Sequence, residues 1–155
     1  MSCLKLVKHA PGAPGLRFFG LGPRLLPSKG MAELQNLLNK HAFWAKGRNT
    51  KQLRHLLSKS TAVITLWRDQ RMVGFGRATS DGIYRAVLWD IVVAGELQGM
   101  GLGRQVVDAL LNSPTLKNVE RIYLMTTNST EFYLQLGFKR SHRQELLFIE
   151  STDLL

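Results

Sequence analysis

Three glycines separated by single residues lie just before a helix-like segment. The run 98–104 contains Gly99, Gly101 and Gly103 and follows an apolar, strand-like stretch that ends at Val93. A glycine-rich turn between a strand and a helix leaves backbone N–H groups unpaired, and the positive end of the helix dipole points the same way. The pattern therefore predicts a pyrophosphate site, and with it a cofactor that contains a nucleotide.

The spacing of the glycines narrows the type of phosphate site. No Gly-Lys-Ser or Gly-Lys-Thr follows them, so the run is not the phosphate-loop pattern. A dinucleotide-binding fold would place its glycine turn after the first strand of a larger α/β array, whereas several elements precede this one. The alternative is a flexible loop with chance glycines, and the position between strand and helix argues against it.

Asp90 lies in an apolar strand between Trp89 and Ile91 and should point opposite to both. An unpaired buried carboxylate is unfavourable, so Asp90 should be paired with a cation, be hydrogen-bonded, or face a wet cleft. In the last case it would accept a proton from an incoming ammonium group, directly or through water. Glu96 is a weaker candidate base, because a solvated loop position explains it better.

Metal and cysteine chemistry are not indicated. Histidines at positions 9, 41, 55 and 142 show no ligand spacing, so no metal site is expected. Cys3 is the only cysteine, which excludes an internal disulfide and favours a reducing compartment.

The charge of the chain is unevenly distributed. Its net charge is +10, and the part through Arg68 carries twelve Lys or Arg but a single acid, Glu33. The rest carries nine Lys or Arg and ten acids. This asymmetry predicts either an anionic partner for the first half (nucleic acid, acidic lipid or an anionic cofactor) or a solvated basic surface. No run approaches the roughly 20 apolar residues of a membrane span, so no membrane partner is expected.

Hydrophobic periodicity predicts an α/β chain. Helices are expected at 29–43, from Thr50 onward, at 104–111 and after Asn128 or Ser129. Strands are expected at 16–21, 61–67, 72–79, 84–93, 121–127 and 145–149. The strand-turn-helix-strand unit at 86–127 should be a right-handed parallel crossover.

Two separated motifs resemble those of one enzyme family. Trp-Asp-Ile-Val-Val at 89–93, followed by Glu96 and Gln-Gly-x-Gly-x-Gly-Arg at 98–104, resembles motif A of the GCN5-related N-acetyltransferases (GNAT). Phe-Tyr-x-x-x-Gly-Phe at 132–138 resembles their motif B. At finer grain these segments, with 74–81 and 119–127, are similar to the cyanobacterial and plastid branch that includes serotonin (arylalkylamine) N-acetyltransferases.

The resemblance implies a single acetyltransferase domain over 1–155 with the GNAT fold, an α/β (α+β) fold. One mixed central sheet of about six to seven strands would be flanked by about four helices, and two central parallel strands would splay into a V. An arm at 1–27 would hold the first strand, helices at 28–58 would shape the acceptor side, and 60–150 would form the acetyl-CoA-binding core.

The same resemblance implies where acetyl-CoA binds. Its pantetheine amides would pair with the strand edge at Val92 and Val93, in the way an added strand does. Its pyrophosphate would rest on the amides of the glycine turn, namely those of Gln98, Gly99, Met100, Gly101, Leu102, Gly103 and Arg104. Asn128 would either contact the pantetheine arm or only cap the next helix.

Tyr133 is the residue expected to carry the chemistry, because the family has a tyrosine at this place. Acyl transfer to an amine expels a thiolate, and the departing sulfur benefits from a proton donor. The alternative is a core aromatic with a satisfied hydroxyl. An N–H near Val93 would stabilise the oxyanion, and Asp90 would serve as the base.

The expected activity is transfer of an acetyl group from acetyl-CoA to a primary amine, with an arylalkylamine such as serotonin or tryptamine as acceptor, as in melatonin biosynthesis. The alternatives are a protein lysine or N-terminal acetyltransferase, or a non-catalytic module that binds RNA or a protein. A homodimer is left open, and the resemblance implies a cyanobacterial cytoplasm or a plastid. Four aromatic residues are expected in the core, and one or two of them could instead line an acceptor pocket: Phe43, Trp44, Trp67 and Phe75.

Overall fold

The computed structural model describes residues 3–154, and the chain divides into two compact units. The larger unit ends at Met125 and the smaller one begins at Thr126. All strands of the described residues belong to the larger unit. The smaller unit holds the helix α5 (Thr130–Gln135) and the 3₁₀ turn η4 (Ser151–Leu154).

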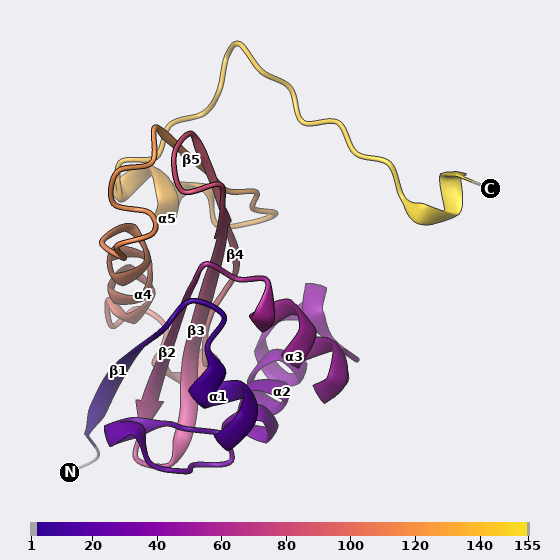
Figure 1. The fold of residues 1–155 in the computed structure, drawn as a ribbon. Coiled ribbons are helices and arrows are strands. Elements are labelled where there is room, and N and C mark those ends of the chain that lie inside the picture. The colour runs from indigo at the N-terminus through magenta and orange to yellow at the C-terminus, as the bar shows by residue number, and fades with distance from the viewer. Residues whose placement is uncertain (1–2, 155) are drawn as a thin grey trace. The chain divides into compact units, whose positions relative to one another are not determined.

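A mixed sheet forms the centre of the larger unit (Figure 1). Its five strands, in spatial order, are β1 (Leu4–His9), β2 (Ala62–Arg68), β3 (Arg71–Ser80), β4 (Arg85–Val93) and β5 (Arg121–Tyr123). Strands β1 to β4 pair antiparallel, and β5 pairs with β4 in parallel. The mixed α/β sheet and the parallel connection are confirmed, although the described residues form five strands rather than six or seven.

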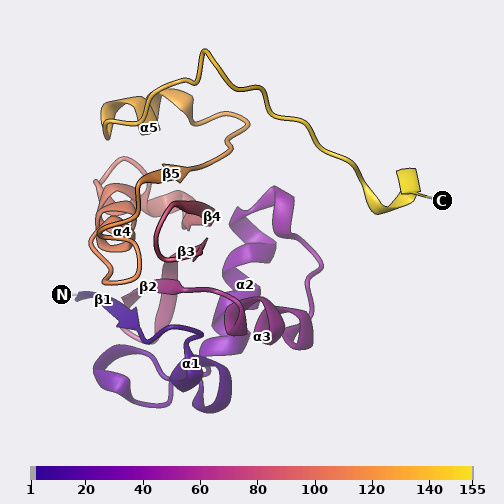
Figure 2. The same cartoon turned by 45° about the horizontal axis from the view of Figure 1, so that its top comes forward.

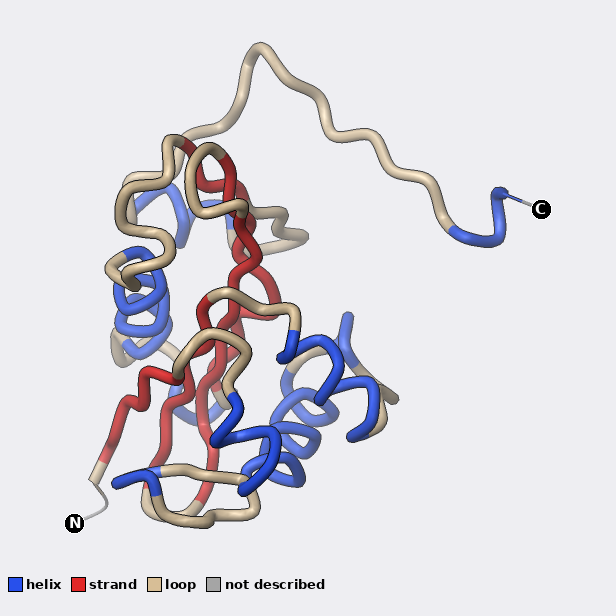
Figure 3. Tube along the Cα trace, viewed as in Figure 1, coloured by secondary structure: helices blue, strands red, loops and turns tan. Residues whose placement is uncertain are grey.

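Helices cover both faces of this sheet. The larger unit contains α1 (Pro14–Phe19), α2 (Gly30–His41), α3 (Thr50–Ser58) and α4 (Leu102–Leu111), with 3₁₀ turns η1 (Pro23–Leu25), η2 (Phe43–Ala45) and η3 (Gly95–Leu97). Figures 2 and 3 show α2 and α3 on one side of the strands and α4 on the other. The two predicted helices on the acceptor side and the helix after the glycine turn are confirmed.

Close packing against the sheet fixes α4. Its buried side chains include Val106 and Leu110, at the spacing of one helix face. A Cβ added at Gly76 of β3 would lie 2.7 Å from Val106, 2.8 Å from Ile91 and 3.0 Å from Leu110. The glycine therefore lets the helix approach the strand, and each buried aliphatic side chain contributes about 1.5–3 kcal/mol. The start of α4 is thus held firmly beyond the end of β4.

The strand predicted at 16–21 is wrong, because this segment contains α1. Pro14 begins the helix, and Gly20 ends it in the left-handed region at φ 61°. These local signals outweigh the apolar run, and Leu16 points into the core. The first strand is instead β1, where Val7 is buried and its neighbour Lys8 is exposed.

The strand predicted at 145–149 is also absent. Its four apolar side chains, from Leu146 to Ile149, are exposed, and the segment forms no strand pairing. A continuous apolar run is typical of a strand buried on both faces. Within the described residues of the smaller unit there is no sheet for it to join, so its backbone has no strand partner.

Side-chain hydrogen bonds also link β1 to β2. The Thr65 hydroxyl accepts a hydrogen bond from Trp67 Nε1 at 2.8 Å and lies 2.8 Å from His9 Nε2. Burial disfavours the charged imidazolium and lowers the pKa of His9 to about 4. His9 is therefore neutral in the folded protein at neutral pH.

We expect the free energy of unfolding to fall as the pH is lowered from about 6.5 to about 4. In this window the unfolded chain protonates His9 while the folded chain keeps it neutral, so protons favour unfolding. The contribution should be on the order of 1–2 kcal/mol, measured by urea unfolding at about pH 7 and pH 4.5. His9→Gln should reduce the loss, and the same change at exposed His142 should not. Equal pH dependence in both variants would contradict this role.

Candidate functional site

The glycine turn is exposed and lies directly before α4. Gly99 and Gly101 have left-handed φ values of 82° and 78°, and a Cβ at either position would meet no atom within 4 Å. The glycines are therefore required by backbone conformation rather than by crowding. Gly101 is the N-cap of α4 and offers no side chain to its amides, and Gly103 lies in the first helical turn. The first N–H groups of α4 are thus available to an anion.

Two side chains at the turn have identifiable partners. Gln98 donates from Nε2 to the carbonyl oxygen of Val93 at 3.2 Å, which ties the turn to the end of β4. Arg104 is exposed and lies 3.7 Å from Asp108, one helical turn further on. Its role toward a phosphate stays a prediction.

Strand β4 has an open edge on the side of β5. The parallel pairing covers only Arg85 to Val87, opposite Arg121 to Tyr123. β4 continues to Val93, so its later backbone groups have no strand partner on this side. The open edge matches the expected separation of the two parallel strands, and it can accept an extended ligand as an added strand. Val92 and Val93 lie on this stretch with buried side chains.

A bulge in β4 carries Asp90. The register with β3 shifts between Phe75, which faces Val92, and Arg77, which faces Trp89. Asp90 lies in the bulged part of β4 and has a left-handed φ of 57°. Such a conformation is unfavourable for residues other than glycine and persists only where surrounding contacts hold it.

Those contacts are ionic. Oδ2 of Asp90 lies 2.8 Å from Arg77 Nε and 3.1 Å from Arg48, while Oδ1 accepts a hydrogen bond from Trp44 Nε1 at 2.9 Å. The carboxylate is only 5% exposed. Burial by itself would raise the pKa of Asp90, but Arg77, Arg48 and Trp44 outweigh it and hold that pKa below its usual value.

The sequence left three environments open for Asp90: paired with a cation, hydrogen-bonded, or facing a wet cleft. In the structure its carboxylate is both paired with cations and hydrogen-bonded. Both carboxylate oxygens are occupied and the pKa is low, which is unfavourable for a base. The catalytic role stays a prediction. The pairing of Arg77 with Asp90 could have been predicted from the β3–β4 hairpin, because antiparallel pairing places Arg77 opposite Trp89, the neighbour of Asp90. Trp44 and Arg48 come from a distant loop and give no local signal.

Two of the four aromatic residues predicted in the core lie on the surface. Trp67 and Phe75 are fully buried as expected, but Phe43 is 57% and Trp44 45% exposed. Their rings meet edge to face, with centroids 5.1 Å apart. The bond from Trp44 to Asp90 holds the pair outside the core, next to the bulge of β4.

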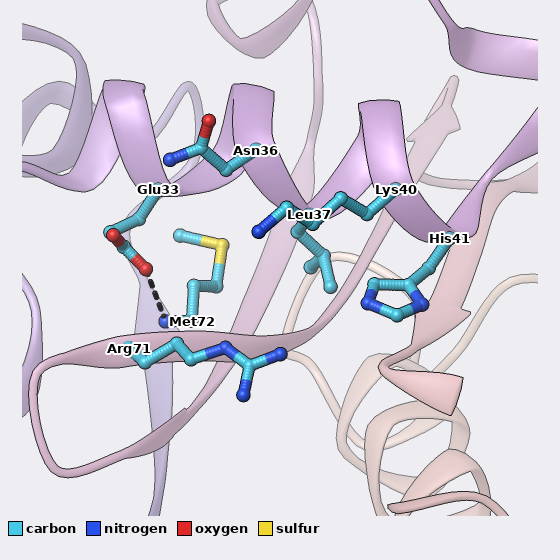
Figure 4. Close-up of a pocket in the computed structure, with 7 residues that line it drawn as sticks. All are labelled: Glu33, Asn36, Leu37, Lys40, His41, Arg71 and Met72. Atoms are coloured by element: carbon cyan, nitrogen blue, oxygen red, sulfur yellow. Dashed lines mark hydrogen bonds between the residues drawn. The ribbon is translucent and has the colours of Figure 1, made fainter. Parts of the chain in front are cut away.

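A cavity of about 120 Å³ lies between α2 and the start of β3 (Figure 4). Its lining includes His41, whose Nδ1 accepts a hydrogen bond from the Gly95 N–H at 3.1 Å and whose Nε2 is buried without a partner. Arg71, also in the lining, pairs with Glu96 at 2.5 Å. These bonds anchor η3 and hence the approach to the glycine turn. No sequence pattern pointed to His41.

The smaller unit contains the other two predicted site residues. Tyr133 packs against Phe132 and Phe138, with ring centroids 4.9 Å and 5.8 Å away, and burial raises its pKa to about 12. Its phenol is therefore protonated at neutral pH and able to donate. Asn128 accepts from the Ser129 hydroxyl at 3.3 Å. The N-cap of α5 is Ser129, so capping does not account for Asn128.

Neither a metal-binding cluster nor a membrane-spanning helix is found among the described residues. Among residues 3–154, no three His, Cys, Asp or Glu side chains gather in a way that could hold a metal ion. In the same part of the chain, no helix combines the length and apolarity needed to cross a bilayer.

Known proteins resemble this chain in sequence. The uncharacterized N-acetyltransferase ycf52 of Pyropia yezoensis is 34% identical over 100 residues, which cover 61% of this chain and 57% of that protein. Serotonin N-acetyltransferase 2, chloroplastic, of Oryza sativa subsp. japonica is 37% identical over 99 residues, or 59% of this chain and 48% of that one. The chain thus spans about half the length of these relatives.

Solved structures share the fold. A putative acetyltransferase of the GNAT family from Xanthomonas campestris pv. campestris superposes with a TM-score of 0.69 at 22% identity, covering 99% of this chain and 97% of that one. An aminoglycoside N-acetyltransferase in complex with CoA gives 0.67 at 14% identity, covering 97% and 96%. The model of the acetyltransferase (GNAT) family matches residues 31–138, most of the chain. The chain belongs to the acetyltransferase (GNAT) family.

Proposed function

We propose that the protein transfers an acetyl group from acetyl-CoA directly to a primary amine. The observation that carries the proposal is the exposed, uncapped start of α4 beyond the open edge of β4. The helix start suits a diphosphate, and the unpaired strand suits the two amides of a pantetheine arm. A protein of the same fold has been solved with CoA, which supports the choice of cosubstrate.

Each residue of the proposed site has one role in binding or catalysis. Val92 and Val93 pair with the pantetheine, and the amides of 98–104 hold the pyrophosphate. The amine nitrogen attacks the acetyl carbon, an N–H near Val93 stabilises the oxyanion, and the carbon–sulfur bond then breaks. Tyr133 gives its proton to the departing thiolate, and the proton that the amine nitrogen loses returns to the phenolate through solvent. This last assignment rests on the family motif and on the protonated state of the phenol.

The acceptor is proposed to be a small arylalkylamine such as serotonin or tryptamine. The exposed pair Phe43 and Trp44 offers aromatic surface beside the bulge of β4. Residues 40–59 carry six Lys or Arg and no acid, which disfavours a polycationic acceptor such as a polyamine. Similarity to a serotonin N-acetyltransferase points the same way. A plastid or a cyanobacterial cytoplasm is proposed as the location, since relatives are chloroplastic.

Release of free thiol from acetyl-CoA tests the activity. We expect thiol release with tryptamine or serotonin, and much less with spermidine or a lysine peptide. Preference for lysine peptides would support a protein acetyltransferase instead. No release with any member of a broad amine panel would overturn the enzymatic function and favour a binding module.

Gly101→Val should weaken acetyl-CoA binding by at least about tenfold, because valine does not readily take the left-handed φ of the turn. Isothermal calorimetry measures the affinity. Gly82→Val is a matched control, since Gly82 has φ 81° and equally open surroundings outside the turn. Equal affinities in the two variants would contradict the phosphate site.

Tyr133→Phe should lower turnover by about 100-fold and leave the cofactor dissociation constant unchanged. The ring contacts with Phe132 and Phe138 persist, so only the proton donor is lost. Steady-state thiol release and calorimetry separate the two effects. Tyr84→Phe, at an exposed position, serves as the control. Unchanged turnover in Tyr133→Phe would remove the phenol from the mechanism.

A further inference from the structure

The N-terminal segment repeats one short pattern. Arg17-Phe18-Phe19 and Arg24-Leu25-Leu26 each place an arginine before two large apolar residues, seven positions apart. The structure exposes all four apolar side chains: Phe18 by 67%, Phe19 by 70%, Leu25 by 64% and Leu26 by 55%. Single exposed apolar residues need no explanation, but two adjacent pairs within nine residues form a patch that indicates an interaction surface.

The loop that carries the second triplet has a fixed shape. Leu21 and Pro27 form an antiparallel bridge, and the Gly22 N–H donates to the Leu26 carbonyl at 2.8 Å. At its tip, Arg24 and Leu25 take left-handed φ values of 59° and 57°. Such values are strained for both residue types, and strain of this kind often marks a functional position. The backbone bonds hold Leu25 outward.

The two triplets lie at the same end of the larger unit. Figures 1 and 2 both show α1 next to the loop that follows it, at the end of the larger unit away from β5. The guanidinium of Arg17 lies 4.7 Å from the centre of the Phe18 ring, and Arg54 donates to the Arg17 carbonyl at 3.2 Å. Both triplets therefore lie on neighbouring segments at one end of the larger unit.

The exposed charged side chains of residues 17–29 are cations. Arg24 and Lys29 are exposed, and Arg54 adds a third cation from α3. Residues 3–32 include no Asp or Glu. The first acid, Glu33, is directed to β3, where it accepts a hydrogen bond from the Met72 N–H at 2.9 Å. The partner should thus be anionic and should also accept apolar side chains.

We propose that the surface formed by residues 17–29 docks on an anionic lipid bilayer. The two apolar pairs enter the boundary between headgroups and acyl chains, and the arginines remain at the level of the lipid phosphates. A nucleic acid would leave the leucine pair unused, because bases stack on aromatic faces. No membrane partner was expected because the chain has no spanning run, but docking at the membrane surface requires none, and acidic lipid is among the anionic partners that the charge asymmetry predicts.

Co-sedimentation of the full chain with vesicles tests the proposal. One set contains phosphatidylcholine alone, and the other adds phosphatidylglycerol to about 30%. We expect at least about tenfold stronger partitioning onto the anionic vesicles. Leu25→Asn/Leu26→Asn and Phe18→Ser/Phe19→Ser should each lower it by about tenfold, and Arg24→Glu by a similar factor.

Leu25→Asn is the informative variant. Asparagine accepts a left-handed φ more readily than leucine, so the fold should be kept or stabilised while lipid binding falls. Thermal unfolding checks the fold, and Ile83→Asn is the control because Ile83 is 62% exposed on the β3–β4 turn.

Three outcomes would overturn the proposal. They are equal binding to neutral and anionic vesicles, wild-type binding by both variants that remove an apolar pair, and tighter binding of polyuridylate or an acidic peptide with the same dependence on the two pairs.

Discussion

The buried ion-pair cluster around Asp90 is the constraint on which the larger unit depends. It joins three segments distant in sequence: β4 at the bulge, β3 through Arg77, and the η2–α3 connection through Trp44 and Arg48. Removing one partner of such a cluster leaves an uncompensated buried charge, which costs about 3–5 kcal/mol. The cluster therefore fixes both the strained backbone of β4 and the loop that presents the aromatic pair.

Several modest bonds order the backbone at the end of β4. His41 holds Gly95, Arg71 holds Glu96, and Gln98 reaches back to the end of the strand. Burial of the apolar face of α4 then sets the direction of its first amides. These bonds order the backbone around the positive end of α4, and the proposed anion site would therefore need no rearrangement of the turn.

The two halves of the chain separate two kinds of chemistry. The nearly neutral second half carries the two motifs that resemble those of the family, whereas the basic first half carries exposed apolar and cationic side chains. Within that basic half, η2 exposes the aromatic pair, and the loop after α1 exposes Leu25 and Leu26. A fold of this size can present both surfaces because the sheet lies between α4 and the N-terminal helices (Figure 2).

Local sequence signals by themselves determined the glycine turn, strands β2 to β5 and the helix α4 between β4 and β5. Hydrophobic periodicity, helix caps and turn residues each act over only a few positions. Tertiary structure decided the rest. The apolar runs at 16–21 and 145–149 look alike in sequence, yet flanking Pro14 and Gly20 turn one into a helix, while the other finds no sheet to join. The partners of Asp90 and the exposure of Phe43 and Trp44 depend on which distant segments pack together. Residue spacing along the chain does not indicate which segments these are.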